Sequence, residues 1–433
     1  MTLRLPILAG LSIGVHFRTA HNSRMSVFPV RIRWRSVWAA ARRRAATARC
    51  LQTARATAPV GREATSRRAT ATQLRRLATT PPQHGLDEVG AANLDWPRLG
   101  FDFQKTNGFV KHTWVNGKWD EGEWEPEPFL KLHVMSAAIH YGQGVYEGAK
   151  AHHCKDGSVR LWNIQANAHR MLEGCDRMMM PSVPPEMFIR ACEWCVAANR
   201  AYIPPYGTGG ALYLRPYIFG HGPQLGLSAA PQFHFCVLAM PVSSYYAGGL
   251  QPIDVLVAHD ADRAAPQGVG HVKASGNYGS DIRVSIDARA EGYPTVLYLD
   301  PKEKRYIEEF SVSNFIGIKD DTYVTPDSPT ILRSATNDML MDLAASDAFG
   351  MKVERRPVDV NELGEFREVA GCGTAVVMMG VKSITHRDTV HQYESIERVE
   401  ALYNHYRAIQ FGEEEDPFGW GTVCPPLADV AAA

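Results

Sequence analysis

Short apolar strands separated by tight turns recur along most of the chain and restrict it to a sheet-rich fold. The stretch 108–153 alternates apolar and polar residues, with the turn signal NGK inside it and DGS just after it. Two longer strand patterns follow, GALYLRPYIFG and FHFCVLAMPV. Because many of these strands are joined by turns rather than by helices, we expect an α/β fold with α+β character and largely antiparallel sheets.

The strands fall into two groups, each accompanied by helical patterns. Between the groups lies SSYYAGGLQP, which places serine, glycine and proline between apolar strands and is the candidate domain linker. The expected helices are NIQANAHRMLEGCDRMMM, PPEMFIRACEWCVAANRAYIP, SDIRVSIDARAEG and RSATNDMLMDLAASDAFG. We therefore predict a leader at 1–85, a small N-terminal α/β domain at 90–243, an interdomain linker at 244–262 and a large C-terminal domain at 263–433.

The leader has a composition unlike the rest of the chain. Residues 1–80 hold sixteen of the 46 basic residues, all arginine, and a single one of the 46 acids, Glu63. Arginine-rich, acid-poor N-termini with many alanines, serines and threonines are typical of mitochondrial transit peptides, so we predict the mitochondrial matrix as the location. A nucleic-acid-binding arm is an alternative, but the acidic remainder of the chain would repel phosphates. A disordered or spurious extension is another.

No membrane partner and no metal site are expected from the sequence. No apolar run approaches the roughly 18 to 20 residues that a membrane span needs. Cys192 and Cys195 have CxxC spacing, but their helical surroundings indicate a buried helix face. No second CxxC or neighbouring histidine completes a zinc site.

Lys273 stands in the segment GHVKASGNYGSD, close to Gly270, Gly276 and Gly279. An amine in a desolvated, glycine-rich loop can have a lowered pKa and act as a nucleophile. The best-known use of such a lysine is a Schiff base with pyridoxal 5′-phosphate. That cofactor needs an acid against its pyridine nitrogen, backbone amides around its phosphate and a cation.

The chain contains candidates for each of these groups. They are Glu308 and Glu309 in RYIEEFSVSN, Ser334, Ala335 and Thr336 at a helix start, Thr374 in the turn GCGT, and Arg170 and Arg215 within apolar segments. Strand alternation predicts that one of the two glutamates points inward and the other points to solvent. No single one of these signals is specific, so the prediction depends on their combination.

The segments VGHVKASGNYGS, IEEFSVSNF and GCGTA together resemble the class IV pyridoxal-phosphate-dependent aminotransferases, which have fold type IV. The resemblance is greatest to the branched-chain amino acid aminotransferases. The upstream segments IHYGQGVYEGAKAH, NAHRML and ALYLRPYIFG arrive in the order of that family. The resemblance covers about residues 90 to 415. It implies a two-domain fold with an interdomain loop, and a C-terminal domain that binds pyridoxal 5′-phosphate.

The resemblance also implies roles for individual residues. Lys273 matches the Schiff-base lysine and general acid/base, Tyr278 the partner of the cofactor's phenolic oxygen, and Glu309 the acid at the pyridine nitrogen. The residues that match the phosphate site are Arg170, Ala335, Thr336 and Thr374. The residues that match the substrate site are Tyr141, Tyr146, Tyr213 and Arg215, together with Thr374 and Ala375, whose amides would hold the α-carboxylate. Tyr141 and Leu225 match residues that reach the partner subunit, which implies a homodimer.

The implied reaction moves the amino group of L-Leu, L-Ile or L-Val to 2-oxoglutarate and yields branched-chain 2-oxo acids and L-glutamate. Two features of this chain depart from the family. Some mammalian relatives have a CxxC redox switch directly after the GTA turn, whereas residues 376–379 of this chain contain no cysteine. Bulky Phe310 follows Glu309, and Ser311, Val312 and Ser313 follow Phe310. The resemblance implies that these positions border the substrate side chain, so it leaves the donor preference open. The alternatives are a D-amino acid or (R)-amine aminotransferase, an aminodeoxychorismate lyase, a specialised-pathway aminotransferase, and a non-catalytic relative.

Overall fold

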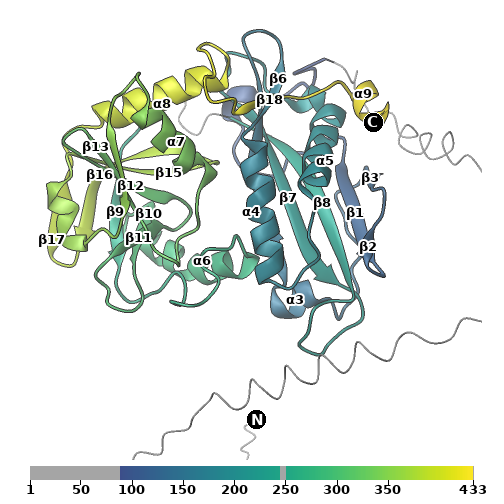
Figure 1. The fold of residues 1–433 in the computed structure, drawn as a ribbon, viewed down its shortest axis with the longest axis horizontal. Coiled ribbons are helices and arrows are strands. Elements are labelled where there is room, and N and C mark those ends of the chain that lie inside the picture. Colours follow the sequence, from purple (N-terminus) through teal and green to yellow (C-terminus); the bar gives the residue numbers. More distant parts are fainter. Residues whose placement is uncertain (1–87, 244–249, 433) are drawn as a thin grey trace, which may run out of the picture. The chain divides into compact units, whose positions relative to one another are not determined.

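The computed structural model describes residues 88–243 and 250–432, which all belong to one compact unit covering residues 68–433. The predicted leader at 1–85 and residues 244–249 of the predicted linker lie outside the described residues. The described residues form two sheets, one built mainly from the first half of the chain and one from the second (Figure 1).

The first sheet is antiparallel in all of its described pairings and has the strand order β18-β6-β5-β7-β8-β1-β2, with β3 on β1 and β4 on β7. Its strands are β1 (Phe109–Val115), β2 (Lys118–Trp119), β3 (Glu123–Glu125), β4 (Gly144–Tyr146), β5 (Ala149–His153), β6 (Val159–Trp162), β7 (Ala211–His221), β8 (Gln232–Val242) and β18 (Gly421–Val423). The helices of this half are η2 (Trp96–Arg98), α3 (Ala137–Tyr141), α4 (Ile164–Arg177), α5 (Pro185–Ala198) and η3 (Arg200–Tyr202).

Side-chain alternation on β7 gives this sheet one buried face and one face that is free for a site. Leu212 and Leu214 pack into the core with α4 and α5, which lie along the same face of β7 and β8 (Figure 1). Tyr213 and Arg215 therefore point to the opposite face. Alternation along β7 thus separates the core residues of this strand from its candidate site residues.

The second sheet is mixed and has the strand order β11-β10-β9-β16-β15-β12-β13-β14, with β17 on β16. Its strands are β9 (Ile253–Ala258), β10 (Thr295–Leu299), β11 (Ile307–Phe310), β12 (Asn314–Lys319), β13 (Thr322–Pro326), β14 (Lys352–Arg356), β15 (Glu368–Gly373), β16 (Val377–His386) and β17 (Thr389–Gln392). Its helices are α6 (Ser275–Ala290), α7 (Ala335–Ala345), η4 (Val360–Glu365) and α8 (Glu397–Gln410), with α9 (Leu427–Ala432) near the C-terminus.

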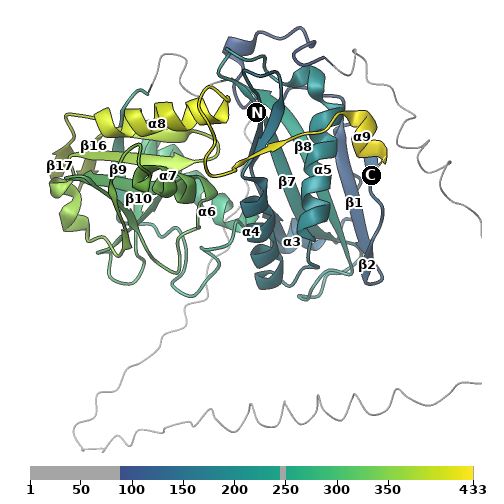
Figure 2. The ribbon, with the colours of Figure 1, turned by 45° about the horizontal axis from the view of Figure 1, so that its top comes forward.

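An additional pairing of β11 with β12 closes part of the second sheet into a ring. One apolar cluster fills the ring and includes Phe310, Phe315 and Leu297. A second cluster lies between the sheet and the helices α7 and α8, and Figure 2 shows α8 lying along β16. A residue of β11 therefore faces either the apolar interior of the ring or its outside.

The α/β class with largely antiparallel pairing is confirmed, but two domain boundaries need correction. Residues 253–258 of the predicted linker form β9, which lies between β10 and β16 and pairs in parallel with both. Residues 421–423 of the predicted C-terminal domain form β18, which pairs with β6 of the first sheet. The strands β15 and β16 form a hairpin, and Thr374 lies in the turn between them.

Cys192 and Cys195 lie on α5 and are buried, which confirms the prediction of a buried helix face. Among the described residues, no helix has both the length and the apolar content to cross a bilayer.

Candidate active site

A cavity of about 310 Å³ lies between side chains of the two halves. Its size falls at the lower end of the range usual for small-molecule sites. Among the residues that line it are the predicted site residues Tyr146, Arg170, Tyr213, Arg215, Lys273, Tyr278, Glu309, Thr374 and Ala375. Ala335 and Thr336 line a smaller adjoining cavity, of which Thr374 is also a wall.

Lys273 lies two residues before the start of α6, and its side chain forms part of the cavity wall. Its Nζ donates a hydrogen bond to the Tyr278 hydroxyl over 3.1 Å and lies 4.9 Å from the centre of the Tyr146 ring. The expected glycine-rich loop is shorter than predicted, because Gly276 and Gly279 belong to α6. The helix geometry, rather than a flexible loop, therefore sets the Lys273–Tyr278 pair.

Gly270 allows the segment before Lys273 to pack closely. A Cβ at this position would lie 2.3 Å from the Thr330 carbonyl oxygen, which no side chain could tolerate. The segment is also tied to the first half of the chain, because the amide of Tyr146 donates to the Lys273 carbonyl over 3.1 Å. The backbone on both sides of the lysine is thus fixed.

Glu309 extends from the outer side of β11 into the cavity, and donors surround its carboxylate. Its Oε1 accepts a hydrogen bond from the backbone N–H of Leu332 over 2.9 Å and pairs with the Arg263 guanidinium. Its Oε2 accepts a hydrogen bond from the side-chain amide of Asn314 over 3.2 Å. Burial raises the pKa of Glu309 to about 7, and the Arg263 charge opposes that rise. These contacts hold the carboxylate in one orientation.

The other glutamate does not reach solvent, so that prediction is wrong. Glu308 is buried and accepts hydrogen bonds from the hydroxyls of Ser328 and Thr330. Burial raises its pKa, and the Thr330 and Ser328 hydroxyls oppose that rise. The opposite side of β11 is covered by protein rather than by water, which pattern alternation alone cannot reveal.

The prediction that Phe310 borders the substrate is also wrong. Phe310 is fully buried inside the ring of strands and stacks on Phe315, with 5.9 Å between the ring centres. Adjacent residues of a strand point to opposite faces, so the orientation of Glu309 into the cavity directs Phe310 away from it. Ser311, Val312 and Ser313, the other positions expected to border the substrate, do line the cavity next to Glu309.

Arg170 of α4 provides a fixed cation at one end of the cavity. Its Nε and Nη2 donate to the two carboxylate oxygens of buried Glu147 over 2.7 and 2.6 Å. Its Nη1 donates to the Arg333 carbonyl over 2.8 Å, directly before the start of α7. The N-terminus of α7, at Ala335 and Thr336, combines free amides with this guanidinium, and such a combination fits a phosphate group.

The other end of the cavity combines aromatic faces with a second cation. The Arg215 guanidinium lies 4.7 Å from the centre of the Tyr146 ring and donates to the Tyr213 hydroxyl over 3.2 Å. Burial raises the pKa of Tyr146, so its hydroxyl stays neutral. A Cβ at Gly148 would lie 2.3 Å from the Tyr213 hydroxyl oxygen, so this glycine makes room for that ring.

Tyr141 lies apart from this group. Its ring is 43% exposed, and its hydroxyl donates to the carbonyl of Leu225, which is itself 53% exposed. Neither residue lines the cavity among the residues that the structure describes.

Several cavity residues were not predicted from the sequence, and two of them contact predicted site residues. Arg263 pairs with Glu309, and Phe101 packs edge-on against Tyr213 with 5.7 Å between ring centres. Arg263 precedes Lys273 in the same segment, but nothing in its neighbours distinguishes it from a surface arginine. Phe101 belongs to an irregular segment without strand or helix periodicity, so no pattern pointed to it.

The cavity has the groups that a pyridoxal enzyme requires, and comparison with known proteins agrees. Residues 144–384 match the family model described as amino-transferase class IV. This match covers more than half of the chain, and the chain belongs to the class IV aminotransferases. The cofactor of this class is pyridoxal 5′-phosphate.

Similar proteins narrow the class. The chain is 43% identical over 339 residues to the branched-chain-amino-acid aminotransferase of Haemophilus influenzae, covering 76% of this chain and 98% of that protein. It is 37% identical over 339 residues to the chloroplastic branched-chain-amino-acid aminotransferase 5 of Arabidopsis thaliana, covering 77% and 81%. The solved branched-chain aminotransferase of Escherichia coli superposes with a TM-score of 0.59 at 25% identity, covering 73% and 99%.

Proposed function

We propose that this aminotransferase moves the amino group of L-Leu, L-Ile or L-Val to 2-oxoglutarate and releases branched-chain 2-oxo acids and L-glutamate. The observation that carries the proposal is one cavity in which Lys273, Tyr278 and Glu309 face the rings of Tyr146 and Tyr213, against which the Arg215 guanidinium lies. Relatives with the branched-chain name, similar over nearly their whole length, support the same substrate class.

The residues would divide the work by position. Bound pyridoxal 5′-phosphate supplies the electron sink for the reaction. Lys273 anchors the cofactor and moves the proton at the substrate Cα. Glu309 holds a proton on the pyridine nitrogen, and Tyr278 donates to the phenolic oxygen. Arg170, Ala335, Thr336 and Thr374 hold the phosphate, and the amides of Thr374 and Ala375 hold the substrate α-carboxylate.

One pocket must accept both an apolar side chain and the side-chain carboxylate of 2-oxoglutarate. The faces of Tyr146 and Tyr213 offer apolar surface to the branched side chain. Arg215 lies against both rings and can pair with a carboxylate when the second substrate enters. This arrangement allows the two substrates to bind in turn at the same place.

A panel of amino donors tests the substrate class. Burying a Leu or Ile side chain contributes roughly 1.5 to 3 kcal/mol, so we expect kcat/KM to exceed that of L-Ala by about ten- to a hundredfold. D-Leu should be inactive, because fixed carboxylate and side-chain subsites present only one face of Cα to Lys273. The measurement is initial-rate transamination with 2-oxoglutarate as the acceptor.

The same panel separates the alternatives. Equal rates with D- and L-amino acids, or a preference for (R)-amines without a carboxylate, would contradict the proposal and favour another class IV activity. Formation of a lyase product without any amino-group acceptor would do the same. No turnover with any donor, despite bound cofactor, would favour a non-catalytic relative.

A homodimer is part of the proposal. Tyr141 and Leu225 are exposed and lie away from the chain's own cavity, as expected of residues that complete a partner's pocket. The face of β7 and β8 opposite to α4 and α5 carries Tyr217, Phe219 and Leu238, and Leu238 is 37% exposed. An apolar sheet face of this kind is usually covered by protein. Light scattering on the purified protein should give the mass of two chains, and a single-chain mass would contradict this part.

The leader is proposed to direct the chain to mitochondria, on the basis of its sixteen arginines and single acid. Residues 1–85 fused to a fluorescent protein should therefore bring the reporter into the mitochondrial matrix. The matched control replaces six of the arginines by glutamine, and this fusion should remain in the cytosol. Chloroplast import in plant cells, or cytosolic fluorescence of the unaltered fusion, would contradict the mitochondrial address.

A further inference from the structure

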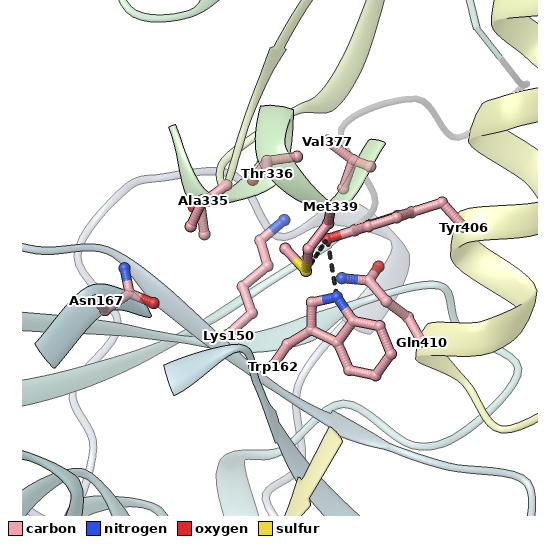
Figure 3. Close-up of a pocket in the computed structure, with 10 residues that line it drawn as sticks. Lys150, Trp162, Asn167, Ala335, Thr336, Met339, Val377, Tyr406 and Gln410 are labelled. Carbon is pink, nitrogen blue, oxygen red and sulfur yellow. Dashed lines mark hydrogen bonds between the residues drawn. The ribbon is translucent and has the colours of Figure 1, made fainter. Parts of the chain in front are cut away.

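A chain of buried side-chain amides leads from Glu309 to the helix α7. Asn337 is the third residue of α7 and directly follows Ala335 and Thr336, which line the smaller cavity shown in Figure 3. Asn337 is 3% exposed, and Asn314, the first residue of β12, is 5% exposed. The Nδ2 of Asn337 donates a hydrogen bond to the Oδ1 of Asn314 over 3.3 Å, so the two amides connect α7 with the carboxylate of the candidate site.

The amide of Asn314 presents its donor group to Glu309. Its Nδ2 donates to the Oε2 of Glu309 over 3.2 Å and to the Leu332 carbonyl over 3.0 Å. The backbone N–H of Leu332 in turn donates to the Oε1 of Glu309, so the three residues form a closed ring of hydrogen bonds. A carbonyl can only accept, so it fixes which end of the Asn314 amide is the nitrogen. The Oδ1 of Asn314 therefore points away from Glu309 and needs a donor of its own.

Asn337 supplies that donor, and two hydroxyls fix its own orientation. The Thr325 hydroxyl donates to the Phe315 carbonyl over 2.8 Å, so its oxygen accepts from the Nδ2 of Asn337, at 2.9 Å. The Tyr323 hydroxyl donates to the Oδ1 of Asn337 over 2.7 Å. A reversed amide would place its oxygen against the oxygens of Thr325 and Asn314 and lose these contacts. The direction of donation thus runs without a break from Asn337 through Asn314 to the carboxylate.

This direction of donation matters because burial works against the charge of Glu309. Burial raises the pKa of this carboxyl to about 7, and Glu308 adds to the rise, while the Arg263 charge and the Leu332 N–H oppose it. A hydrogen bond donated to a carboxylate favours its ionised form, so the Asn314 donor acts in the same direction as Arg263. In the proposed function Glu309 and the pyridine nitrogen share one proton. A carboxyl that keeps this proton for itself therefore leaves the nitrogen unprotonated.

We propose that Asn337 is a positioning residue, which acts through Asn314 to hold the Glu309 carboxylate ionised and in place. The proposal rests on the proposed function, in which Glu309 holds a proton on the pyridine nitrogen. Asn314 lines the candidate site, whereas Asn337 is not among the described residues that do. The backbone N–H of Asn337 donates to the Ser334 hydroxyl over 3.3 Å, so a change of its side chain does not remove this cap of α7.

The test compares holoenzyme variants by the protonation of the pyridine nitrogen and by rate. The probe is pyridoxal phosphate with ¹⁵N in its ring, and solid-state NMR of the substrate-free holoenzyme shows whether that nitrogen carries a proton. In Asn314→Leu and in Asn337→Leu, the resonance should shift from the protonated toward the unprotonated position. Stopped-flow absorbance with L-Leu should show a half-reaction slowed about thirtyfold in Asn314→Leu, the scale of a hydrogen bond to a charged group. It should be slowed about fivefold in Asn337→Leu, the scale of a neutral hydrogen bond.

The double variant shows whether the two asparagines act in series. If Asn337 acts only through Asn314, its loss has no further effect once the Asn314 amide is gone. Asn314→Leu/Asn337→Leu should therefore be slowed about thirtyfold, like Asn314→Leu alone. Independent effects would multiply to about 150-fold. Such a product would show that Asn337 acts by another route and would overturn the proposal.

Tyr323→Phe is the matched control. It removes a hydrogen bond from the other end of the Asn337 amide but leaves the donation to Asn314 in place. It should lower the thermal stability and keep the wild-type nitrogen resonance and half-reaction. An equal shift in Tyr323→Phe and Asn337→Leu would attribute the effect to lost stability and would count against the proposal. If Asn337→Leu does not fold because the Tyr323 hydroxyl is left unpaired, Tyr323→Phe/Asn337→Leu removes both partners and is compared with Tyr323→Phe.

The same measurements separate this inference from the proposed function. A protonated nitrogen and a wild-type rate in Asn337→Leu overturn the role of Asn337 and leave the role of Glu309 intact. An unprotonated nitrogen in the wild type shows that the proposed role of Glu309 is wrong, and the role of Asn337 falls with it.

Discussion

Replacement of Lys273 by alanine should reduce transamination by at least about a thousandfold, the scale expected for loss of a nucleophile that also moves protons. The Lys273 amine lies at the wall of the cavity, within hydrogen-bond distance of Tyr278. Among the described residues that line the cavity there is no second lysine that could replace it. The visible absorbance band of lysine-linked pyridoxal phosphate should disappear, while far-UV circular dichroism should be unchanged. Rates are measured with L-Leu and 2-oxoglutarate.

A matched control is available for Lys273 in the same half of the chain. Lys304 pairs with Asp262 at the surface, and Lys304→Ala should keep both the absorbance band and the activity. Normal turnover by Lys273→Ala, with the band intact, would show that another group forms the covalent link and would contradict the assignment of the site.

The exchange of Glu309 for glutamine should have the second largest effect. Both carboxylate oxygens of Glu309 accept from donors, namely Arg263, the Leu332 amide and Asn314. The amide nitrogen of glutamine would have to face one of these donors, and a neutral amide cannot hold a proton on the pyridine nitrogen as strongly. We expect the half-reaction with L-Leu to slow by about a hundredfold, the scale of removing one preorganised electrostatic group. Stopped-flow absorbance measures this rate.

Glu308→Gln is the control for this variant, because it makes the same chemical change one residue away. Its hydroxyl partners Ser328 and Thr330 can donate or accept, so they adapt to an amide. Its effect on the half-reaction should be much smaller than that of Glu309→Gln. The reverse order of the two variants would place the wrong glutamate in the site and would mean that the strand register is shifted by one residue.

The sequence predicted those parts of the fold and site that local pattern controls. The strand predicted at ALYLRPYIFG is β7, and alternation along it places Leu212 and Leu214 on one face and Tyr213 and Arg215 on the other. Helix periodicity located α4 and α5, with Cys192 and Cys195 on a buried face. The ordered motifs predicted that Lys273, Tyr278 and Glu309 share one site, and the structure places all three at the same cavity.

Features that depend on long-range closure could not be predicted. Glu308 was misplaced because Ser328 and Thr330, in the segment between β13 and α7, cover it, and Phe310 because it faces the apolar cluster inside the ring of strands. Arg263 and Asn337 find their partners across segments distant in sequence, at Glu309 and Asn314. The residues next to such a side chain in the sequence do not show which distant segment it will contact.

The return of the chain from the second sheet to the first has a consequence for synthesis in the cell. Residues 421–423 pair with β6 and complete the edge of the first sheet. During translation, the first sheet emerges from the ribosome long before these residues, so β6 remains an unpaired edge for most of the time that the nascent chain is being extended. Unpaired edges recruit other strands. We therefore expect the nascent chain to be most prone to association through this edge until β18 has been synthesised.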